Sequence, residues 1–242
     1  MEKHAVYTGT KNLYGDMQTA AKSLIANSDV DKVWLLVEDD SFDYWLPDIC
    51  EVVDVHDQQF FPNDGPNMST QYTYMAMIRC ALALMPQFAD LDRILSLDVD
   101  TIANRRVSDV WDLPLGDEYY FAAVREQHRS IGNLMYTNIG VTLMNLDKLR
   151  NGKAEEFVDA LNRWQFRWIE QDVMNYLCQG RILEMPPEYN ACDFTKHDFV
   201  RIRHFAAQGA DRWRKDNLVR QYREMSWDKA LKFHEKQVAK NG

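Results

Sequence analysis

The sequence predicts an α/β fold in a single domain: a mostly parallel sheet flanked by helices, with a helical C-terminal tail. Three observations point to this fold. Apolar, strand-like runs alternate with segments of helical spacing. The chain has 242 residues, 46% of them hydrophobic, which is enough for one large core. The central apolar run, Arg93 to Leu97, ends in the carboxylates of Asp98 and Asp100, as buried strands do at a ligand-binding edge.

The first hundred residues predict four strands and two helices. The strands are expected at 4–8, 32–37, 51–55 and 93–101. A polar loop that extends through Tyr14 leads into a helix over 17–26. Ser69 is expected to cap a long helix that continues to about Leu84, and Pro86 ends it.

The second half predicts shorter elements. Strands are expected at 120–124, 138–146, 181–183 and 201–205, and helices at 154–166, 171–178 and within 212–240, with a short helix near Trp111. Residues 125–136 lack periodicity and are interpreted as a mobile loop. We expect residues 1–213 to form the main domain and residues 214–242 a basic, aromatic helical extension.

The charge and amino-acid composition of the chain disfavour several classes of protein. The chain carries a formal net charge of −9, which disfavours a broad nucleic-acid-binding surface. Residues 201–242 differ, with 11 Lys and Arg against 5 Asp and Glu, so this end could contact an anionic membrane or nucleic acid, or be an ordinary solvated surface. The four cysteines show no C-x-x-C spacing, which predicts reduced thiols. With no bilayer-spanning apolar run, and a first strand near His4 that leaves no room for a signal peptide, we expect a cytoplasmic protein.

The spacing of Asp98 and Asp100 suggests a metal site. Residues i and i+2 of a strand point the same way, so two carboxylates can converge on one hard cation. An ion with few protein ligands keeps open positions for a diphosphate. Thr8, at the end of the first strand, is expected at the same rim of the sheet. The alternative is an ordinary polar strand end or turn, because an isolated D-x-D pattern is weak evidence.

Five blocks of the chain carry polar motifs in a defined order, at residues 8–14, 92–113, 138–146, 170–175 and 204–213. The second contains the D-x-D pattern, the third an Asn-x-Gly-Val strand, the fourth Glu-Gln-Asp and the last His-Phe followed by Trp. Together these blocks resemble family 8 of the retaining glycosyltransferases, the group that includes glycogenin and bacterial lipooligosaccharide galactosyltransferases. The resemblance implies a GT-A type nucleotide-diphospho-sugar transferase fold, with catalysis in residues 1–213.

The resemblance also implies the roles of individual residues. Asp98, Asp100 and His204 would hold Mn²⁺, or Mg²⁺, beside the diphosphate of a UDP-sugar; an imidazole ligand suits Mn²⁺ better. Gln171 would lie beneath the anomeric carbon, with Asp172 beside it. The other residues implied to bind the donor are Thr8, Thr10, Asn12, Tyr14, Val99, Arg79 and Asn138. Read singly, these residues could equally be helix caps, turn residues or exposed polar side chains.

Some positions depart from the family pattern. Ala207 and Ala210 stand where the family usually has a glycine and a phosphate-binding lysine, and Gly209 with Arg212 could replace that pair, since a guanidinium binds phosphate bidentately. Glu170 replaces the usual Asp, Arg125 a frequent sugar-binding acid, and Ile139 a small residue. We interpret the last three as a donor pocket altered for a sugar other than galactose or glucose, such as a pentose.

The predicted function is metal-dependent, retaining transfer of a hexose or pentose from a UDP-sugar to a hydroxyl acceptor. An amide beneath the anomeric carbon disfavours a covalent intermediate and favours front-face substitution. A lipid-linked or lipopolysaccharide-type glycan is the leading acceptor, with peripheral membrane contact through the basic tail, and modified DNA the alternative. Two other classes stay open: a non-catalytic UDP-sugar-binding protein, and a general metal-dependent nucleotidyltransferase.

Overall fold

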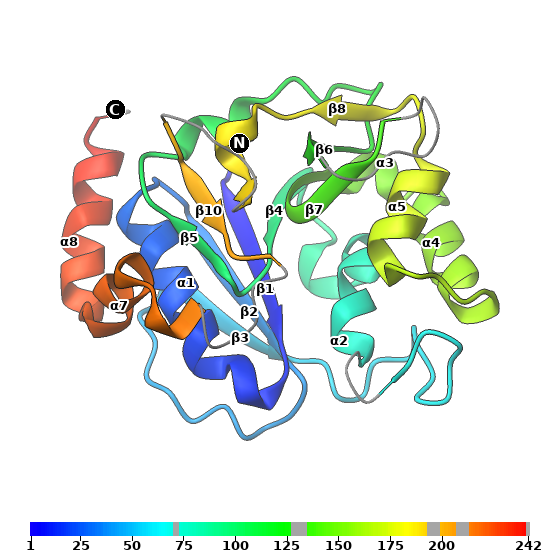
Figure 1. Ribbon diagram of the computed structural model, residues 1–242, viewed down its shortest axis with the longest axis horizontal. Coiled ribbons are helices and arrows are strands. Elements are labelled where there is room, and N and C mark those ends of the chain that lie inside the picture. Colours follow the sequence, from blue (N-terminus) through cyan, green and yellow to red (C-terminus); the bar gives the residue numbers. More distant parts are fainter. Residues whose placement is uncertain (70–72, 127–134, 193–198, 207–212, 241–242) are drawn as a thin grey trace.

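The centre of the molecule is a seven-stranded sheet. The computed structural model describes residues 1–69, 73–126, 135–192, 199–206 and 213–240. The strand order is β3-β2-β1-β4-β7-β6-β8 (Figure 1). The strands are β1 (His4–Gly9), β2 (Lys32–Val37), β3 (Cys50–Asp54), β4 (Arg93–Leu97), β6 (Phe121–Arg125), β7 (Thr137–Asn145) and β8 (Ile182–Glu184). β3, β2, β1 and β4 pair in parallel, and only β7 runs antiparallel to its neighbours. The prediction of a mostly parallel sheet is confirmed.

A second, three-stranded sheet lies beside the first. It contains β5 (Thr101–Ala103), β10 (Ile202–His204) and β9 (Ala191–Cys192), with β10 in the middle. β5 follows β4 after a short turn, and β10 pairs antiparallel with it in a register that sets His204 opposite Thr101. This small sheet therefore brings a late segment of the chain to the end of the central strand.

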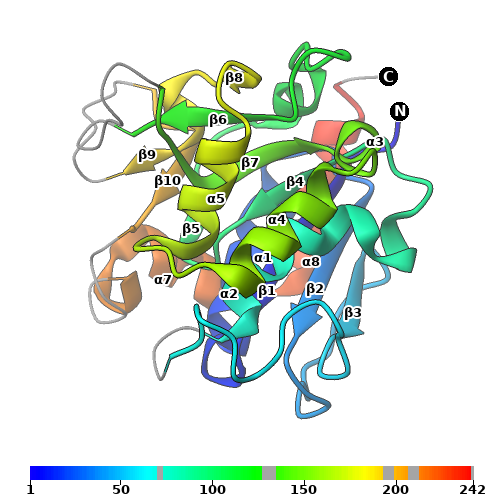
Figure 2. The same ribbon diagram turned by 90° about the vertical axis from the view of Figure 1, so that its right-hand side faces the viewer.

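Helices cover both faces of the large sheet. One face is covered by α1 (Tyr14–Ala26), α7 (Asn217–Glu224) and α8 (Trp227–Val238); on the other lie α2 (Tyr74–Met77), the 3₁₀ helix Ile78–Leu84, α3 (Leu146–Leu149), α4 (Lys153–Arg163) and α5 (Ile169–Leu177) (Figure 2). Further 3₁₀ turns are Lys11–Leu13, Pro86–Phe88, Ser108–Asp112 and Pro187–Tyr189. Because successive strand residues point to opposite faces, Tyr7 packs in one core and Val6 in the other.

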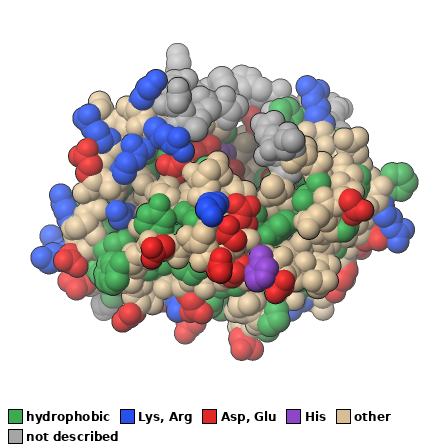
Figure 3. All heavy atoms as spheres, turned by 90° about the horizontal axis from the view of Figure 1, so that it is seen from below, with side chains coloured by type: hydrophobic (Ala, Val, Ile, Leu, Met, Phe, Trp, Pro, Cys, Tyr) green, Lys and Arg blue, Asp and Glu red, His purple; other side chains and the backbone are tan. Residues whose placement is uncertain are grey.

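The C-terminal helices pack against the rest of the protein. Val219, Tyr222 and Ala230 are buried in the same core cluster as α1, and Asn27 Nδ2 donates to the Tyr222 hydroxyl at 2.8 Å. Their basic side chains remain exposed, and Lys and Arg gather on this side of the molecule in Figure 3. Within the described ranges, no helix combines the length and the apolar character that crossing a bilayer requires.

Two local predictions were wrong. Thr73, not Ser69, caps the helix before the central strand: its hydroxyl accepts from Met75 N at 3.2 Å, and the α-helical part ends at Met77 before continuing as a 3₁₀ helix. Tyr14 begins α1 and is not part of a loop. Residues 125–136 were expected to form a mobile loop. Near its two ends Glu126 N donates to Tyr136 O at 2.8 Å, and residues 127–134 lie outside the described residues.

Candidate active site

A pocket lies at the carboxyl end of β1 and β4. These strands are parallel neighbours, with Tyr7 opposite Leu97, so the residues that follow them meet at one edge. The cavity has a volume of about 380 Å³. It is lined by Thr8, Gly9, Thr10, Leu13, Asp16, Thr73, Met75, Ala76, Arg79, Asp98, Val99, Asp100, Glu170 and Trp213. The prediction that Thr8, Asp98 and Asp100 share one rim is confirmed.

Asp98 and Asp100 lie in a turn, not in the strand. β4 ends at Leu97, and the Thr101 hydroxyl donates to Asp98 O at 2.7 Å, closing the turn. Strand alternation is therefore the wrong reason for the convergence of the two carboxylates. The turn is fixed from outside by two backbone bonds: Asp98 N donates to Gly140 O at 2.8 Å, and Phe205 N donates to Asp100 O at 2.9 Å.

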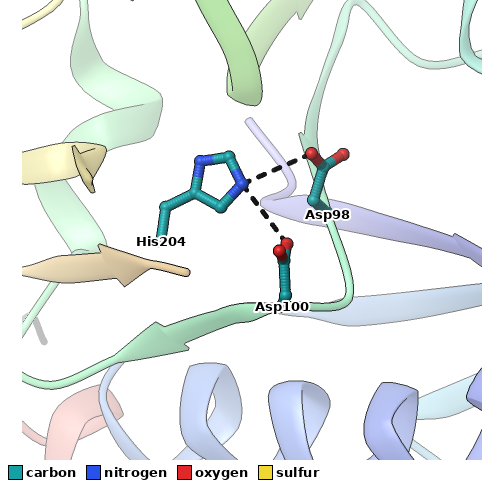
Figure 4. A group of neighbouring side chains, drawn as sticks. All are labelled: Asp98, Asp100 and His204. Carbon is teal, nitrogen blue, oxygen red and sulfur yellow. Dashed lines mark ion pairs between the residues drawn. The ribbon is translucent and has the colours of Figure 1, made fainter. Parts of the chain in front are cut away.

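The second of these bonds belongs to the segment that delivers His204. The pairing of β10 with β5 places the His204 Nε2 atom 3.3 Å from Asp100 Oδ1 and 3.5 Å from Asp98 Oδ2 (Figure 4). Ligand atoms of all three side chains lie within 4.8 Å of one another. Two carboxylates and an imidazole form a donor set that suits Mn²⁺. The residues fit a divalent cation beside the pocket, as the sequence predicts.

Electrostatics at this cluster favour a positive charge. Burial alone would lower the pKa of His204, but the carboxylates of Asp100 and Asp98 outweigh it and raise that pKa well above its ordinary value. Burial likewise opposes ionisation of Asp98, whereas Arg79 and His204 lower its pKa below the ordinary value. Both carboxylates are about one-third exposed and open to the cavity, while the imidazole is 3% exposed. A cation arriving from the pocket therefore meets the oxygens of both carboxylates.

Arg79 is a buried partner of this cluster. Its guanidinium donates from Nη2 to Asp98 Oδ1 and from Nη1 to Ile139 O at 2.5 Å, and the residue is 3% exposed. Arg79 thus lines the pocket and holds the Asp98 carboxylate at the same time. Ile139, interpreted from the sequence as part of an altered donor pocket, is buried in the core and does not line the cavity.

The Glu170–Asp172 segment opens α5 beside this arginine. Gln171 is 9% exposed; its Oε1 accepts from Ile139 N at 3.3 Å and its Nε2 donates to the Tyr136 hydroxyl at 3.2 Å. Both carboxylate oxygens of Asp172 accept hydrogen bonds, from the Tyr136 hydroxyl at 2.6 Å and from Trp168 N at 2.9 Å. In this structure Asp172 therefore closes the first turn of its helix. Neither residue is among those that line the cavity.

Ile169, just before this segment, has a φ of +36°. A β-branched residue avoids this left-handed region, and such strain concentrates at functional sites. The strained residue is buried, and Glu170, which follows it, lines the pocket. Glu170 itself replaces the usual Asp of the family pattern.

Burial raises the pKa of Glu170 from 4.5 to about 7; Arg79 opposes the rise, and Asp98 and Asp172 add to it. In the metal-free protein, the folded state therefore holds a proton on Glu170 at pH values where the unfolded chain has lost it. The free energy of unfolding is expected to fall as the pH rises from about 4.5 to about 7. Glu170→Gln should remove this contribution to the pH dependence. The difference in the free energy of unfolding that Glu170 causes between low pH and pH values above 7 is at most about 3 kcal/mol.

Urea denaturation over this pH range, with a chelator present, measures the effect. Other titrating groups are shared by the wild type and the variant, so the difference between them isolates Glu170. The control is Glu184→Gln, because Glu184 is half-exposed and paired with Arg125. Equal pH profiles for the two variants would contradict the prediction.

Only part of the first block, residues 8–14, lines the pocket. Thr8, Thr10 and Val99 line the pocket, and the Thr10 hydroxyl donates to the exposed Asn12 at 2.6 Å. Tyr14 is 2% exposed and donates to Asp39 Oδ1 at 3.1 Å, and it does not line the pocket.

Leu13 lines the pocket in place of Tyr14, because the 3₁₀ turn that ends at Leu13 directs this residue towards the cavity and the helix turns Tyr14 into the core. The sequence analysis also missed Asp16, Thr73, Met75 and Ala76. The capping pattern at Thr73 was the one available signal for that group.

The other predicted residues lie farther from the cavity or outside the described ranges. Asn138 is half-buried, and its amide bonds to Gly140 N, Asn190 and Glu126. Arg125 forms two hydrogen bonds with Glu184, at 3.1 and 3.0 Å, and does not line the cavity. Gly209 and Arg212, proposed as the phosphate-binding replacement, lie outside the described residues.

Comparison with known proteins agrees with this geometry. The family model described as glycosyl transferase family 8 matches residues 37–197. A putative glycosyltransferase of Haemophilus influenzae is 22% identical over 143 residues, which cover 53% of this chain and 43% of that protein. Glycosyltransferase GlyE of Streptococcus pneumoniae is 24% identical over 263 aligned positions, 95% of this chain and 61% of GlyE. The chain thus spans less than two thirds of the length of either relative.

Solved structures show the same fold. The crystal structure of GlyE superposes with a TM-score of 0.69 at 20% identity, covering all of this chain and 64% of GlyE. Galactosyltransferase LgtC, solved in complex with donor and acceptor sugar analogs, gives a TM-score of 0.61 at 18% identity and covers 93% of this chain and 98% of LgtC. The fold is that of the GT-A glycosyltransferases.

Proposed function

The chain belongs to glycosyl transferase family 8, and we propose that it transfers a sugar from a UDP-sugar to a glycan hydroxyl with retention of configuration. The observation that carries the proposal is the convergence of Asp98, Asp100 and His204 beside a cavity at the carboxyl end of the sheet. Loss of a diphosphate from an anomeric carbon develops negative charge on oxygen, and a fixed positive site stabilises that charge. A bound divalent cation would supply this stabilisation as a Lewis acid.

The chain's own residues would orient the donor. Thr8, Thr10 and Leu13 line the pocket at the end of β1 and in the turn that follows. These residues would bind the nucleoside. Arg79 would face the diphosphate and already holds Asp98 in place. Trp213, buried against Phe205 with ring centroids 5.2 Å apart, also lines the cavity.

The retaining step is proposed to proceed on one face of the sugar. The residue beneath the anomeric carbon, by the family pattern, is Gln171, and an amide is a poor nucleophile for a covalent intermediate. Both ends of this amide are held by Ile139 and Tyr136, which suits a positioning role. The departing phosphate oxygen would then take the proton of the acceptor hydroxyl.

Glu170 supports the proposal of an altered donor sugar. Its side chain is one methylene longer than the usual aspartate and lines the cavity next to Arg79 and Asp98. A longer acid leaves less room where a hexose would carry its outer hydroxymethyl group. We propose a pentose, or another sugar without that bulk, as the donor.

The acceptor is proposed to be a lipid-linked or lipopolysaccharide-type glycan. LgtC was solved with an acceptor sugar analog, which supports a glycan. Exposed basic residues of α7 and α8 could hold the enzyme at an anionic membrane surface on the cytoplasmic side. The four cysteines, all free, are consistent with a reducing compartment.

The test is UDP release from a panel of UDP-sugars without acceptor, with Mn²⁺, with Mg²⁺ and with chelator. Many transferases slowly hydrolyse their donor, so one sugar should give metal-dependent release that chelation abolishes and added Mn²⁺ restores. Release from UDP-xylose or UDP-arabinose above UDP-galactose and UDP-glucose is expected. A clear preference for either hexose would reject the pentose donor. Metal-dependent UDP binding without release from any sugar would indicate a binding protein, and release from nucleoside triphosphates a nucleotidyltransferase.

A further inference from the structure

One buried side chain next to Asp98, Asp100 and His204 has no role in the family pattern described above. Asn190 is 2% exposed and follows the 3₁₀ turn Pro187–Tyr189. Its Oδ1 lies 2.8 Å from Nδ1 of His204, the ring nitrogen that faces away from Asp98 and Asp100. The imidazole is therefore held from both sides.

The orientation of each amide in this region follows from backbone groups. Gly140 N can only donate, and it lies 3.0 Å from the atom assigned as Asn138 Oδ1, so that atom must be the oxygen. The backbone carbonyl of Asn138 can only accept, and it lies 3.2 Å from Asn190 Nδ2, so that atom must be the nitrogen. The same nitrogen donates to Asn138 Oδ1 at 2.9 Å. Asn190 Oδ1 is thus the atom that points at the histidine.

The tautomer of His204 follows. An oxygen of an amide cannot donate, so a 2.8 Å contact with Nδ1 requires that Nδ1 carry the proton. Cys192 Sγ also lies 3.7 Å from Nδ1, but this thiol can instead donate to Asn190 Oδ1, which is 3.8 Å away. The 2.8 Å hydrogen bond between Nδ1 and Asn190 Oδ1 then requires the proton on Nδ1. In the neutral ring, Nε2 is then the unprotonated nitrogen, with its lone pair directed between the two aspartates.

The chain of hydrogen bonds continues to a carboxylate. Asn138 Nδ2 donates to Glu126 Oε2 at 3.3 Å, at the end of β6. Every donor in the series points the same way: from His204 to Asn190, from Asn190 to Asn138 and from Asn138 to Glu126. A metal-binding histidine is commonly oriented and made more basic by such a partner on its other nitrogen.

We propose that Asn190 is a positioning residue of the metal centre, which fixes the Nδ1-protonated tautomer of His204 and aims Nε2 at the cation. This inference rests on the proposed function, because it needs His204 to be a metal ligand. Asn190 does not line the cavity, and its contact with the proposed metal ligands is through His204. It acts through His204, so its removal should weaken metal binding more than it weakens the fold.

The experiment measures Mn²⁺ affinity by electron paramagnetic resonance of the free ion, without any donor sugar. Asn190→Ala is expected to weaken Mn²⁺ binding about 10- to 100-fold. Asn190→Asp keeps an acceptor opposite Nδ1 and should recover most of the lost affinity. The matched control is Asn67→Ala: Asn67 is also buried, at 5% exposed, and its amide bonds to the backbone of Leu161, Trp164 and Phe166. It should bind Mn²⁺ like the wild type.

A spectroscopic readout tests the tautomer directly. In ¹⁵N-labelled protein saturated with diamagnetic Mg²⁺, the one-bond N–H correlation of His204 should appear at Nδ1 and disappear in Asn190→Ala. A correlation at Nε2, or equal Mn²⁺ affinity in the wild type and Asn190→Ala, would overturn the role of Asn190 while leaving the proposed function intact. A wild-type protein that binds neither ion would overturn both.

Discussion

Asp100→Ala is expected to reduce metal-dependent donor hydrolysis about 1,000-fold, equivalent to about 4 kcal/mol of transition-state stabilisation. Its carboxylate is one of three groups that converge on the proposed cation, at 3.3 Å from His204 Nε2. The side chain is about one-third exposed, and within the described ranges its carboxylate forms an ion pair only with His204. The fold should therefore survive this substitution.

Asp98→Ala is expected to lose the same activity and, in addition, to destabilise the fold. Asp98 is the charged partner of Arg79, whose guanidinium is 96% buried. Removing one partner of a buried ion pair leaves an uncompensated charge, and we expect a loss of about 3 kcal/mol beyond that of Asp100→Ala. Ionisation of the nearby Glu170 would offset part of this cost, because an acid whose pKa has been raised by burial can ionise next to the freed guanidinium.

Donor hydrolysis and urea denaturation of both variants check these two expectations. Asp109→Ala is the control, because its carboxylate is about half-exposed and pairs with Arg201 away from the cavity. Mn²⁺-stimulated activity in Asp100→Ala would remove Asp100 from the metal site. Equal stability of the Asp98 and Asp100 variants would show that the buried charge of Arg79 does not need the Asp98 carboxylate as its partner.

Gly140→Ala should disable the metal site by displacing His204. A Cβ at this position would lie 2.6 Å from Nδ1 and 2.8 Å from Nε2 of the imidazole, closer than atoms pack. The ring cannot move without cost, because Asn190 holds it at Nδ1 and the two aspartates contact it at Nε2. We expect overpacking to cost about 1–3 kcal/mol in stability and Mn²⁺ affinity to fall at least about 100-fold.

A matched glycine and a double mutant isolate this effect. Gly15 lies in α1, where an added Cβ meets only the Tyr44 hydroxyl at 3.7 Å, so Gly15→Ala should be neutral or stabilising by up to about 1 kcal/mol. In a His204→Ala background, Gly140→Ala should cost little, because the overlapping ring is gone. Wild-type Mn²⁺ affinity in Gly140→Ala, or full additivity of the two substitutions, would disprove the packing argument.

Local sequence patterns predicted most of the sheet. The strands predicted at 4–8 and 32–37 match β1 and β2 within a residue, because a buried parallel strand requires a continuous apolar run bounded by polar residues. The strand predicted at 93–101 ends at Leu97, because the chain turns after this residue. Helix boundaries were less accurate. Ser69 and Thr73 are both acceptable caps, and local propensity does not choose between them. The change from α to 3₁₀ geometry after Met77 likewise has no signal in the sequence pattern.

The site residues also fall into those that local sequence predicts and those that only tertiary contacts position. The sequence by itself determined that Asp98 and Asp100 directly follow a buried central strand, since the hydrophobic run and its abrupt stop are local features. Only the tertiary structure decided that Leu13 rather than Tyr14 faces the cavity, because one residue of helical rotation turns a side chain from the solvent to the core. Tertiary structure also decided that Arg79 is held by Asp98 and that Asn190 supports His204. The pairing of β5 with β10 brings His204 to the turn after the central strand, and no local pattern encodes that pairing.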